Sequence, residues 1–294
     1  MFPIIPANSA TASGNDEGIF GFGSESDTTN LVSNAGVVAS DVTGVGTARS
    51  YIAACEYGGD KGIFGYGSVG PSEVSMTNLV TNAGVVGTDV TGVGTVRNLL
   101  AACGYGEDKG IFGYGYFGGI LSMTNLVSNA GVVGTDVTGV GTVNHGLAAT
   151  QYGGDKGIFG FGHDGSVTAR TNLVSNVGVV STDVNGVGTA RSGPAACSYG
   201  NDKGIFGFGS TGSKTGVTNL VSNAGVVATD VVAVGTARDY LAACEYGSGK
   251  GIFGFGTTGS VTGVTNLVSN AGVVATDVVA VGTARKDPAA CSFN

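Results

Sequence analysis

Short runs of alternating small and large apolar residues recur six times along this chain. The run G-I-F-G-[FY]-G alternates glycine with large apolar side chains, and successive copies begin 44 to 48 residues apart, at Gly18, Gly62, Gly110, Gly157, Gly204 and Gly251. A second run, T-N-L-V-[ST]-N, follows each copy, at Thr29, Thr77, Thr124, Thr171, Thr218 and Thr265. Neither run has the roughly 3.6-residue period of a helix, so both are predicted to form strands.

Each repeat is predicted to contain four strands separated by turns rich in Gly, Asn and Asp. In the third repeat these strands are Leu99–Tyr105, Gly110–Gly115, Thr124–Ser128 and Val132–Val137. One such unit cannot bury its own apolar face, so repeats of roughly 20–50 residues indicate propellers or solenoids. Six units of four strands predict an all-β fold, a six-bladed β-propeller.

The two ends of the sequence favour a closed ring over an open solenoid. The first repeat enters its glycine run directly at Gly18, whereas Ala289–Asn294 matches the strand that precedes this run in the other repeats. The last strand is therefore expected to complete the first blade, since an open solenoid would need polar capping repeats instead. The predicted propeller spans 18–294 and follows an N-terminal arm, 1–17.

A resemblance to a known family adds to this interpretation. The segment T-A-R-x-x-x-A-A-C-x-Y-G-x-D-K-G-I-F-G-Y-G resembles the kelch motif, in which an arginine precedes a small-residue inner strand and the next strand ends in glycines. The resemblance covers all six repeats, although the tryptophan usual in kelch repeats is absent. The near-identical repeats, with T-N-L-V-S-N and G-V-G-T-A-R, also resemble repeat proteins of environmental bacteriophages. That second resemblance implies a virion or tail component made in the host cytoplasm.

Composition excludes several classes of function. The net charge of −8 and the lack of a basic run argue against a nucleic-acid binder. No apolar run reaches about 18 residues, so no membrane anchor is expected. Residues 1–17 lack the basic and apolar regions of a secretion signal. They are expected to be either a leader without contacts or an arm whose Phe2, Ile4 and Ile5 contact the ring or a neighbouring subunit.

No enzyme or metal-site pattern is evident. Five cysteines share one repeat position, taken by Thr150 in another repeat, and are Cys55, Cys103, Cys197, Cys244 and Cys291. Equivalent positions on separate blades do not face one another, so reduced, buried thiols without disulfides or metal are expected. His145 and His163 lie in variable segments without a triad or metal-ligand pattern. Because no phosphate loop or clustered pair of acids is visible, neither catalysis nor a cofactor is expected.

Two repeated polar positions have open alternatives. An arginine precedes the inner strand in five repeats and Asn144 in another. It is expected to bridge backbone carbonyls of adjacent blades, to pair with the recurring aspartate of the outer strand, or to surround an anionic ligand at the axis. These arginines are Arg49, Arg97, Arg191, Arg238 and Arg285. An asparagine in the second run is expected to hold turns or, alternatively, to bind sugar hydroxyls. These asparagines are Asn30, Asn78, Asn125, Asn172, Asn219 and Asn266.

The repeats differ mainly in two loops, one after the glycine run and one before the inner strand. In an up-and-down blade of four strands both loops emerge on one face, and the repeated G-D-K and N-A-G turns emerge on the other. A varied face suits recognition of an asymmetric partner, with neutral drift of tolerant loops as the alternative. In the third repeat Tyr116, Phe117, Ile120 and Leu121 form the expected apolar contact with a protein.

These observations predict a non-catalytic structural or interaction propeller. The first hypothesis is a phage virion or tail component that docks through its variable loops onto other virion or assembly proteins, or onto copies of itself. The alternative is a carbohydrate-binding propeller that attaches to surface glycans of a host through up to six equivalent sites. A docking protein should concentrate apolar contacts in one or two blades, whereas a lectin should keep its polar and aromatic ligands in most blades.

Overall fold

The computed structural model describes residues 17–232, 234–279 and 281–293, and all of its regular elements are β-strands. They form six three-stranded antiparallel sheets and one two-stranded sheet, so the all-β class is confirmed. None of the described residues belongs to a helix able to cross a membrane. The N-terminal arm with Phe2, Ile4 and Ile5 lies outside the described residues, except for Glu17, with which the first strand begins.

Each three-stranded sheet has an inner, a middle and an outer strand. The inner strands are β20 (Ala289–Phe293), β3 (Ala53–Tyr57), β8 (Ala101–Tyr105), β11 (Ala148–Tyr152), β14 (Ala195–Tyr199) and β17 (Ala242–Tyr246). The middle strands are β1 (Glu17–Gly21), β4 (Lys61–Gly65), β9 (Lys109–Tyr116), β12 (Lys156–Gly160), β15 (Lys203–Gly207) and β18 (Lys250–Gly254). The outer strands are β2 (Thr29–Val32), β7 (Thr77–Val80), β10 (Ile120–Val127), β13 (Thr171–Val174), β16 (Thr218–Val221) and β19 (Thr265–Val268). The two-stranded sheet pairs β5 (Ser68–Val69) with β6 (Ser72–Glu73).

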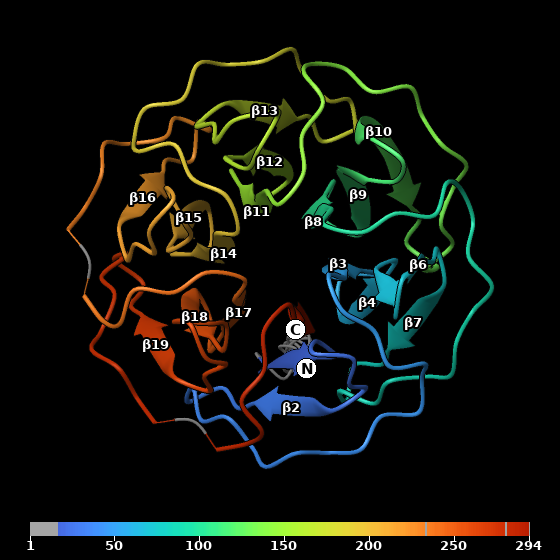
Figure 1. Cartoon of the computed structure of the whole chain (residues 1–294), viewed down its shortest axis with the longest axis horizontal. Coiled ribbons are helices and arrows are strands. Elements are labelled where there is room, and N and C mark those ends of the chain that lie inside the picture. The colour runs from blue at the N-terminus through green and yellow to red at the C-terminus, as the bar shows by residue number, and fades with distance from the viewer. Residues whose placement is uncertain (1–16, 233, 280, 294) are drawn as a thin grey trace, which may run out of the picture.

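The six sheets are arranged around a central axis, with the inner strands nearest to it (Figure 1). Each inner strand contacts the inner strands of both neighbouring sheets, and β20 contacts β17 on one side and β3 on the other. β20 also pairs antiparallel with β1, from Glu17 opposite Phe293 to Gly21 opposite Ala289. The last strand of the sequence therefore completes the first sheet, which is the pairing that the phase of the repeats predicted.

The expected fourth strand does not continue the regular ladder. In the third sheet, Val133 forms an isolated bridge with Val127 of β10. A second bridge joins Val137 to Thr124, so the outer segment has one residue more than β10 between the two bridges. An extra residue on one side is a bulge, which interrupts the ladder. The same two bridges recur in all six sheets, and each sheet consists of three strands with a bridged outer segment.

The glycines of the repeated run allow side chains of one sheet to pack on the backbone of the next. A Cβ on Gly65 would lie 2.8 Å from Cζ of Phe112 in the following sheet. A Cβ on Gly110 would lie 2.5 Å from Sγ of Cys55 in the preceding sheet. Equivalent contacts join all neighbouring sheets, with Thr150 in place of one cysteine. The glycines are therefore required by packing, and the cysteines are buried free thiols, as predicted.

The aromatic residue after the second glycine of each run has a left-handed backbone. Tyr66 has φ 63°, its ring centroid lies 5.1 Å from that of Phe112, and the guanidinium carbon of Arg97 lies 4.2 Å from the ring. This conformation costs a residue other than glycine roughly 1–2 kcal/mol, which the contacts with two side chains of the next sheet offset. The six aromatic residues are Phe22, Tyr66, Tyr114, Phe161, Phe208 and Phe255.

Gly65→Ala is expected to lower the free energy of unfolding by about 1–3 kcal/mol, because the added methyl group would displace the ring of Phe112. Gly119→Ala is the control, since a Cβ there meets nothing within 4 Å, and it is expected to stay within about 0.5 kcal/mol of the wild type. Urea unfolding followed by circular dichroism measures both variants. Equal stability of the two variants would contradict the packing role of Gly65.

Candidate functional site

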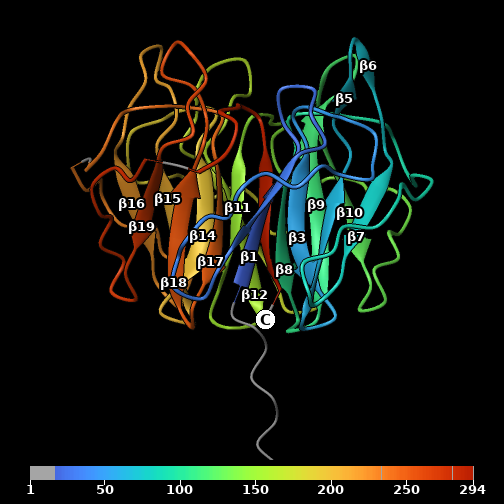
Figure 2. The ribbon, with the colours of Figure 1, turned by 90° about the horizontal axis from the view of Figure 1, so that it is seen from below.

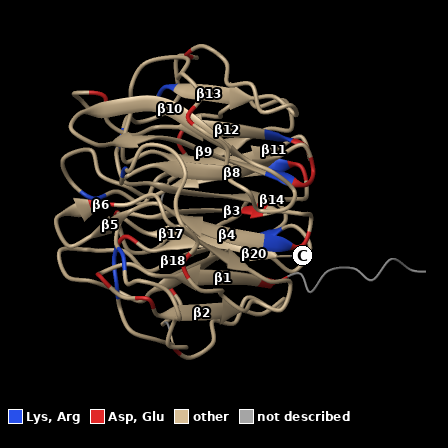
Figure 3. Cartoon of the chain, turned by 90° about the vertical axis from the view of Figure 1, so that its right-hand side faces the viewer, with Lys and Arg blue, Asp and Glu red and all other residues tan. Residues whose placement is uncertain are grey.

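The two variable loops of each repeat lie at the same end of the sheets. In the second repeat Ser50 bridges Ser68, and in the third Asn98 bridges Tyr116. Figure 2 shows this end, marked by β5 and β6, opposite the end at which the last strand finishes. We call these ends the variable-loop face and the uniform face. On the uniform face the repeated turns bring Lys and Asp side by side (Figure 3), as in the pair of Lys109 with Asp108 at 2.5 Å.

A hairpin at residues 116–121 extends the third sheet on the variable-loop face. Tyr116 of β9 pairs with Ile120 of β10, and Leu121 pairs with Gly115. Tyr116 is 40% exposed and Phe117 is 46% exposed, whereas Ile120 and Leu121 are half-buried. The structure thus brings together the four residues that the sequence analysis selected for a protein contact. Their binding role stays a prediction.

Two histidines lie beside this hairpin. The ring of Tyr116 is 5.9 Å from that of His145, which is 5.2 Å from the ring of His163. Burial, followed by the charge of His163, lowers the pKa of His145, which favours its neutral form at pH 7. Sequence reasoning found no partner for either histidine, because the two loops that carry them meet only in the folded sheet.

The repeated arginines form buried polar clusters between the sheets. Arg97 donates from Nε to the backbone oxygen of Tyr114 at 2.9 Å and from Nη2 to Oδ1 of Asn125 at 2.7 Å. Its Nη1 lies 4.0 Å from Oδ1 of Asp136 in the outer segment. Burial lowers the pKa of Arg97. The side chain nevertheless remains charged at pH 7, because the ordinary pKa of arginine lies far above 7. Of the alternatives for the arginines, the clusters support pairing with the outer aspartate and not an anion site at the axis. The expected bridging of adjacent blades through carbonyls is wrong, because the carbonyls that Arg97 binds belong to its own sheet and link.

The asparagines considered as sugar ligands are buried in the same clusters. They are almost completely inaccessible to solvent, and this applies to Asn78, Asn125, Asn172, Asn219 and Asn266. The Nδ2 group of Asn78, for example, donates to Asp89 at 2.9 Å and to the backbone oxygen of Gly87 at 3.0 Å. A glycan cannot reach these side chains, so a carbohydrate site cannot rest on them.

The fourth repeat lacks the buried arginine, and its positive charge lies on an arginine elsewhere in the repeat. Asn144 donates to the backbone oxygen of Phe161 at 2.6 Å. Arg170, in the variable loop after β12, lies 3.9 Å from the repeated aspartate of this sheet, Asp183, and also pairs with Asp164. The cation next to Asp183 therefore comes from a different part of the repeat, a compensation that the sequence pattern did not reveal.

Six residues with left-handed backbones encircle the axis at the variable-loop face. They are Tyr51, Leu99, Gly146, Gly193, Tyr240 and Asp287. Backbone hydrogen bonds join these residues in order. The N–H of Leu99 donates to the backbone oxygen of Tyr51, and the N–H of each later residue donates to the backbone oxygen of the one before it. The last bond runs from Asp287 to Tyr240 at 2.9 Å. These residues line a cavity of about 70 Å³.

The carboxylate of Asp287 is buried in the wall of this axial pocket. The residue is 5% exposed, and neither carboxylate oxygen has a hydrogen-bond partner among the described residues. Burial raises the pKa of Asp287 to about 7; the charge of Lys286 opposes this effect and that of Asp239 adds to it. Sequence reasoning missed Asp287 because the equivalent positions in the other repeats hold no acid.

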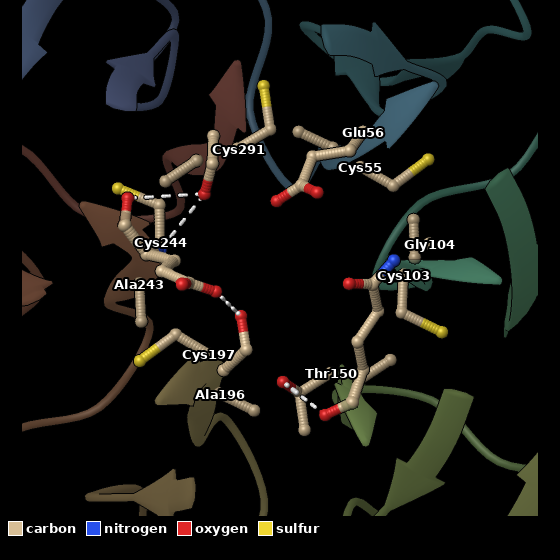
Figure 4. Close-up of a pocket in the computed structure, with 18 residues that line it drawn as sticks. Cys55, Glu56, Cys103, Gly104, Thr150, Ala196, Cys197, Ala243, Cys244 and Cys291 are labelled. Atoms are coloured by element: carbon tan, nitrogen blue, oxygen red, sulfur yellow. Dashed lines mark hydrogen bonds between the residues drawn. The ribbon is translucent and has the colours of Figure 1, made fainter. Parts of the chain in front are cut away.

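Two acids, Glu56 and Glu245, also line a cavity at the uniform-face end of the axis. Glu56 points into a cavity there, while the sulfur atoms of the labelled cysteines point away from it (Figure 4). Burial, followed by the charge of Glu245, raises the pKa of Glu56 to about 7, and the hydroxyl of Ser198 donates to Glu245. The sequence analysis expected no clustered acids, so this pair is a correction. Its cavity of about 50 Å³ is far smaller than a sugar-binding pocket.

No protein-family model and no curated protein matches this sequence. Within the described ranges there is also no group of three or more His, Cys, Asp and Glu side chains that could hold a metal ion. The resemblance to kelch and phage repeats therefore stays a prediction, and function has to follow from the surfaces themselves.

Asp287→Asn is expected to stabilise the protein at pH 8 and to leave its stability unchanged at pH 4. The pKa of Asp287 is raised in the folded state from 3.8 to about 7, so stability falls as pH rises through this window and the unpaired charge stays costly above it. The gain for the variant at pH 8 is at most about 4 kcal/mol. Urea unfolding at both pH values measures it, and an equal effect at pH 4 and pH 8 would contradict the assignment.

Proposed function

We propose that the chain is a six-bladed β-propeller without catalytic activity that binds a protein partner through its variable-loop face. Each blade consists of a three-stranded sheet and its bridged outer segment. Support for a propeller comes from the six repeated sheets around one axis and from the pairing of β20 with β1. Loops of different sequence on one face of a repeated scaffold are the usual location of a recognition site.

The exposed hairpin of the third sheet is the observation that carries the proposal. Tyr116 and Phe117 place two large aromatic side chains in solvent, and aromatic residues contribute strongly to protein interfaces. The corresponding loop of the fifth repeat, Ser210–Val217, reads S-T-G-S-K-T-G-V and offers no aromatic side chain. An apolar contact confined to one blade fits a single asymmetric protein better than six equal ligands.

The resemblance of the repeats to phage repeat proteins suggests the setting of this contact. In that setting the partner is another virion or assembly protein, or a second copy of this chain, and the protein is a virion or tail component. The net charge of −8 supports a protein partner over a nucleic acid.

Phe117→Asp is expected to abolish partner binding without loss of folding, because the side chain contacts solvent and a charge there disfavours burial in an interface. Val132→Asp is the matched control, since Val132 is an exposed apolar residue on the uniform face. A photocrosslinking amino acid at position 117 or 132, used in assembling particles, identifies the partner, and light scattering of the pure protein measures self-association. Crosslinks of equal yield from both positions would contradict docking through the hairpin.

A carbohydrate-binding role is the second candidate, favoured by a groove of about 490 Å³ on the variable-loop face. The ring of Tyr51, the amide of Asn98 and the carboxylate of Glu73 line it, which combines aromatic surface with hydrogen-bonding groups. Oδ1 of Asn98 is buried without a partner among the described residues. Because the groove residues are not repeated, this role would involve one site instead of six. A glycan array in which wild-type binding is lost in Asn98→Ala would support it, and no binding to any glycan would exclude it.

A further inference from the structure

An acid at the variable-loop end of the axis lacks an internal partner. Both carboxylate oxygens of Asp287 are buried in the axial pocket, and no described residue forms a hydrogen bond or ion pair with them. The neighbouring Asp239 is buried to a similar degree, but its carboxylate pairs with Lys214 at 2.6 Å. A buried charge without a partner is strongly destabilising. The fold thus supplies a cation to one of these acids and leaves the other available to a cation from outside.

The backbone conformation at Asp287 does not require an acidic residue. Asp287 has φ 58°, a left-handed conformation that Gly146 and Gly193 adopt at equivalent positions without strain. The hydrogen bond to Tyr240 comes from the backbone N–H of Asp287, so glycine would form it equally well. An aspartate therefore adds backbone strain and a desolvated charge without stabilising the fold, a combination characteristic of functional sites.

Two tyrosines, Tyr51 and Tyr240, line the same pocket as Asp287. The ring centroids of Tyr51 and Tyr240 are 6.1 Å apart, and the ring planes meet at 79°. Tyr51 lines both cavities that Asp287 lines, and burial, followed by the charge of Asp287, raises the pKa of Tyr51. Aromatic faces attract ammonium ions, and a carboxylate with two such rings suits a cation of this kind. A calcium or magnesium ion would need about six oxygen ligands, which this pocket does not offer.

The two cavities that Asp287 lines leave room for an ammonium group carried on a chain. Asp287 and Tyr51 line both the axial pocket of about 70 Å³ and the adjoining groove of about 490 Å³. Glu25 and Glu73 also line the groove, where Lys286 is the cation among the lining residues. The groove therefore carries a net negative charge that attracts a basic ligand.

We propose that the axial pocket binds an alkylammonium group, with Asp287 as its ion-pair partner and the rings of Tyr51 and Tyr240 against its methylene groups. A lysine side chain of a partner protein and a free amine both supply this chemistry. The inference does not depend on the hairpin as the docking segment, because Phe117 lies in a different repeat from all three pocket residues.

Isothermal titration calorimetry at pH 8.5 tests the inference with two ammonium probes. N-acetyl-lysine methylamide represents a lysine side chain, cadaverine represents a free diamine, and N-acetyl-norleucine methylamide is the uncharged control. At least one ammonium probe is expected to bind and the uncharged control is not. Stronger binding of the lysine probe would indicate a protein partner, and stronger binding of cadaverine a free amine. Failure of both ammonium probes, or equal binding of the uncharged control, would overturn the proposal.

Variants identify the anion. Asp287→Asn and Asp287→Gly are each expected to weaken binding at least tenfold, and the glycine variant guards against misfolding because it removes the backbone strain. Glu107→Gln, an exposed acid on the uniform face, is the control and is expected to bind normally. Unchanged affinity in both Asp287 variants would refute the role of Asp287. Phe117→Asp is expected to keep full amine binding. Amine binding therefore tests this proposal, and partner binding by the Phe117 variant tests the hairpin proposal independently.

The affinity is also expected to depend on pH. The charged and titratable groups around the carboxylate are Lys286, Asp239, Tyr51, Tyr240, Glu25 and Glu73. Because the pKa of Asp287 is about 7, affinity should rise between about pH 6 and pH 8.5 as this carboxylate ionises, while an alkylammonium group stays charged up to about pH 10. Asp287→Asn should remove this rise. A flat wild-type profile would contradict the ion pair.

Discussion

A guanidinium ion held out of contact with water is the constraint on which five of the six sheets depend. Burying such a charge is costly unless its donors find acceptors. Arg97 donates to a carbonyl of the middle strand, to the side-chain amide oxygen of Asn125 in the outer strand and to a carbonyl of its own link. In Arg191, Arg238 and Arg285 one guanidinium nitrogen is buried without a hydrogen-bond partner among the described residues. The ring of Tyr66 from the preceding sheet covers the Arg97 cation. One side chain thereby fixes three parts of its own sheet and the position of a neighbour.

The exception to this arrangement coincides with the most divergent part of the variable-loop face. Asn144 requires fewer acceptors than an arginine, and the charge next to Asp183 comes from Arg170 in a variable loop. The adjoining loops hold both histidines of the chain and the ring of Tyr116. The buried cluster and the surface therefore meet in the fourth repeat, where Arg170 of a variable loop lies next to the repeated aspartate of the cluster.

The features predictable from sequence are those that recur in all or nearly all of the repeats. Strand positions, buried cysteines and the division into two faces follow from alternation and repeat phase, since each depends on local pattern alone. The outer segment was misjudged because the bulge between Val133 and Val137 leaves the β-branched pattern intact. The acids of the two axial cavities were missed for a different reason. Glu56 and Asp287 acquire their properties from residues of distant repeats, and no spacing within one repeat records that proximity.

The pairing of β1 with β20 gives the first sheet a different folding history from the others. Five sheets are built from contiguous stretches of chain, so their strands meet after closing short loops. The first sheet can form only when the remaining sheets already bring the two ends of the series together, and loop-closure entropy opposes that step most strongly. Until then the edge of β1 that pairs with β20 is free, and an unpaired strand edge is a site at which strand exchange with another chain can begin. The first sheet is therefore the one whose formation depends most on the order in which the sheets assemble.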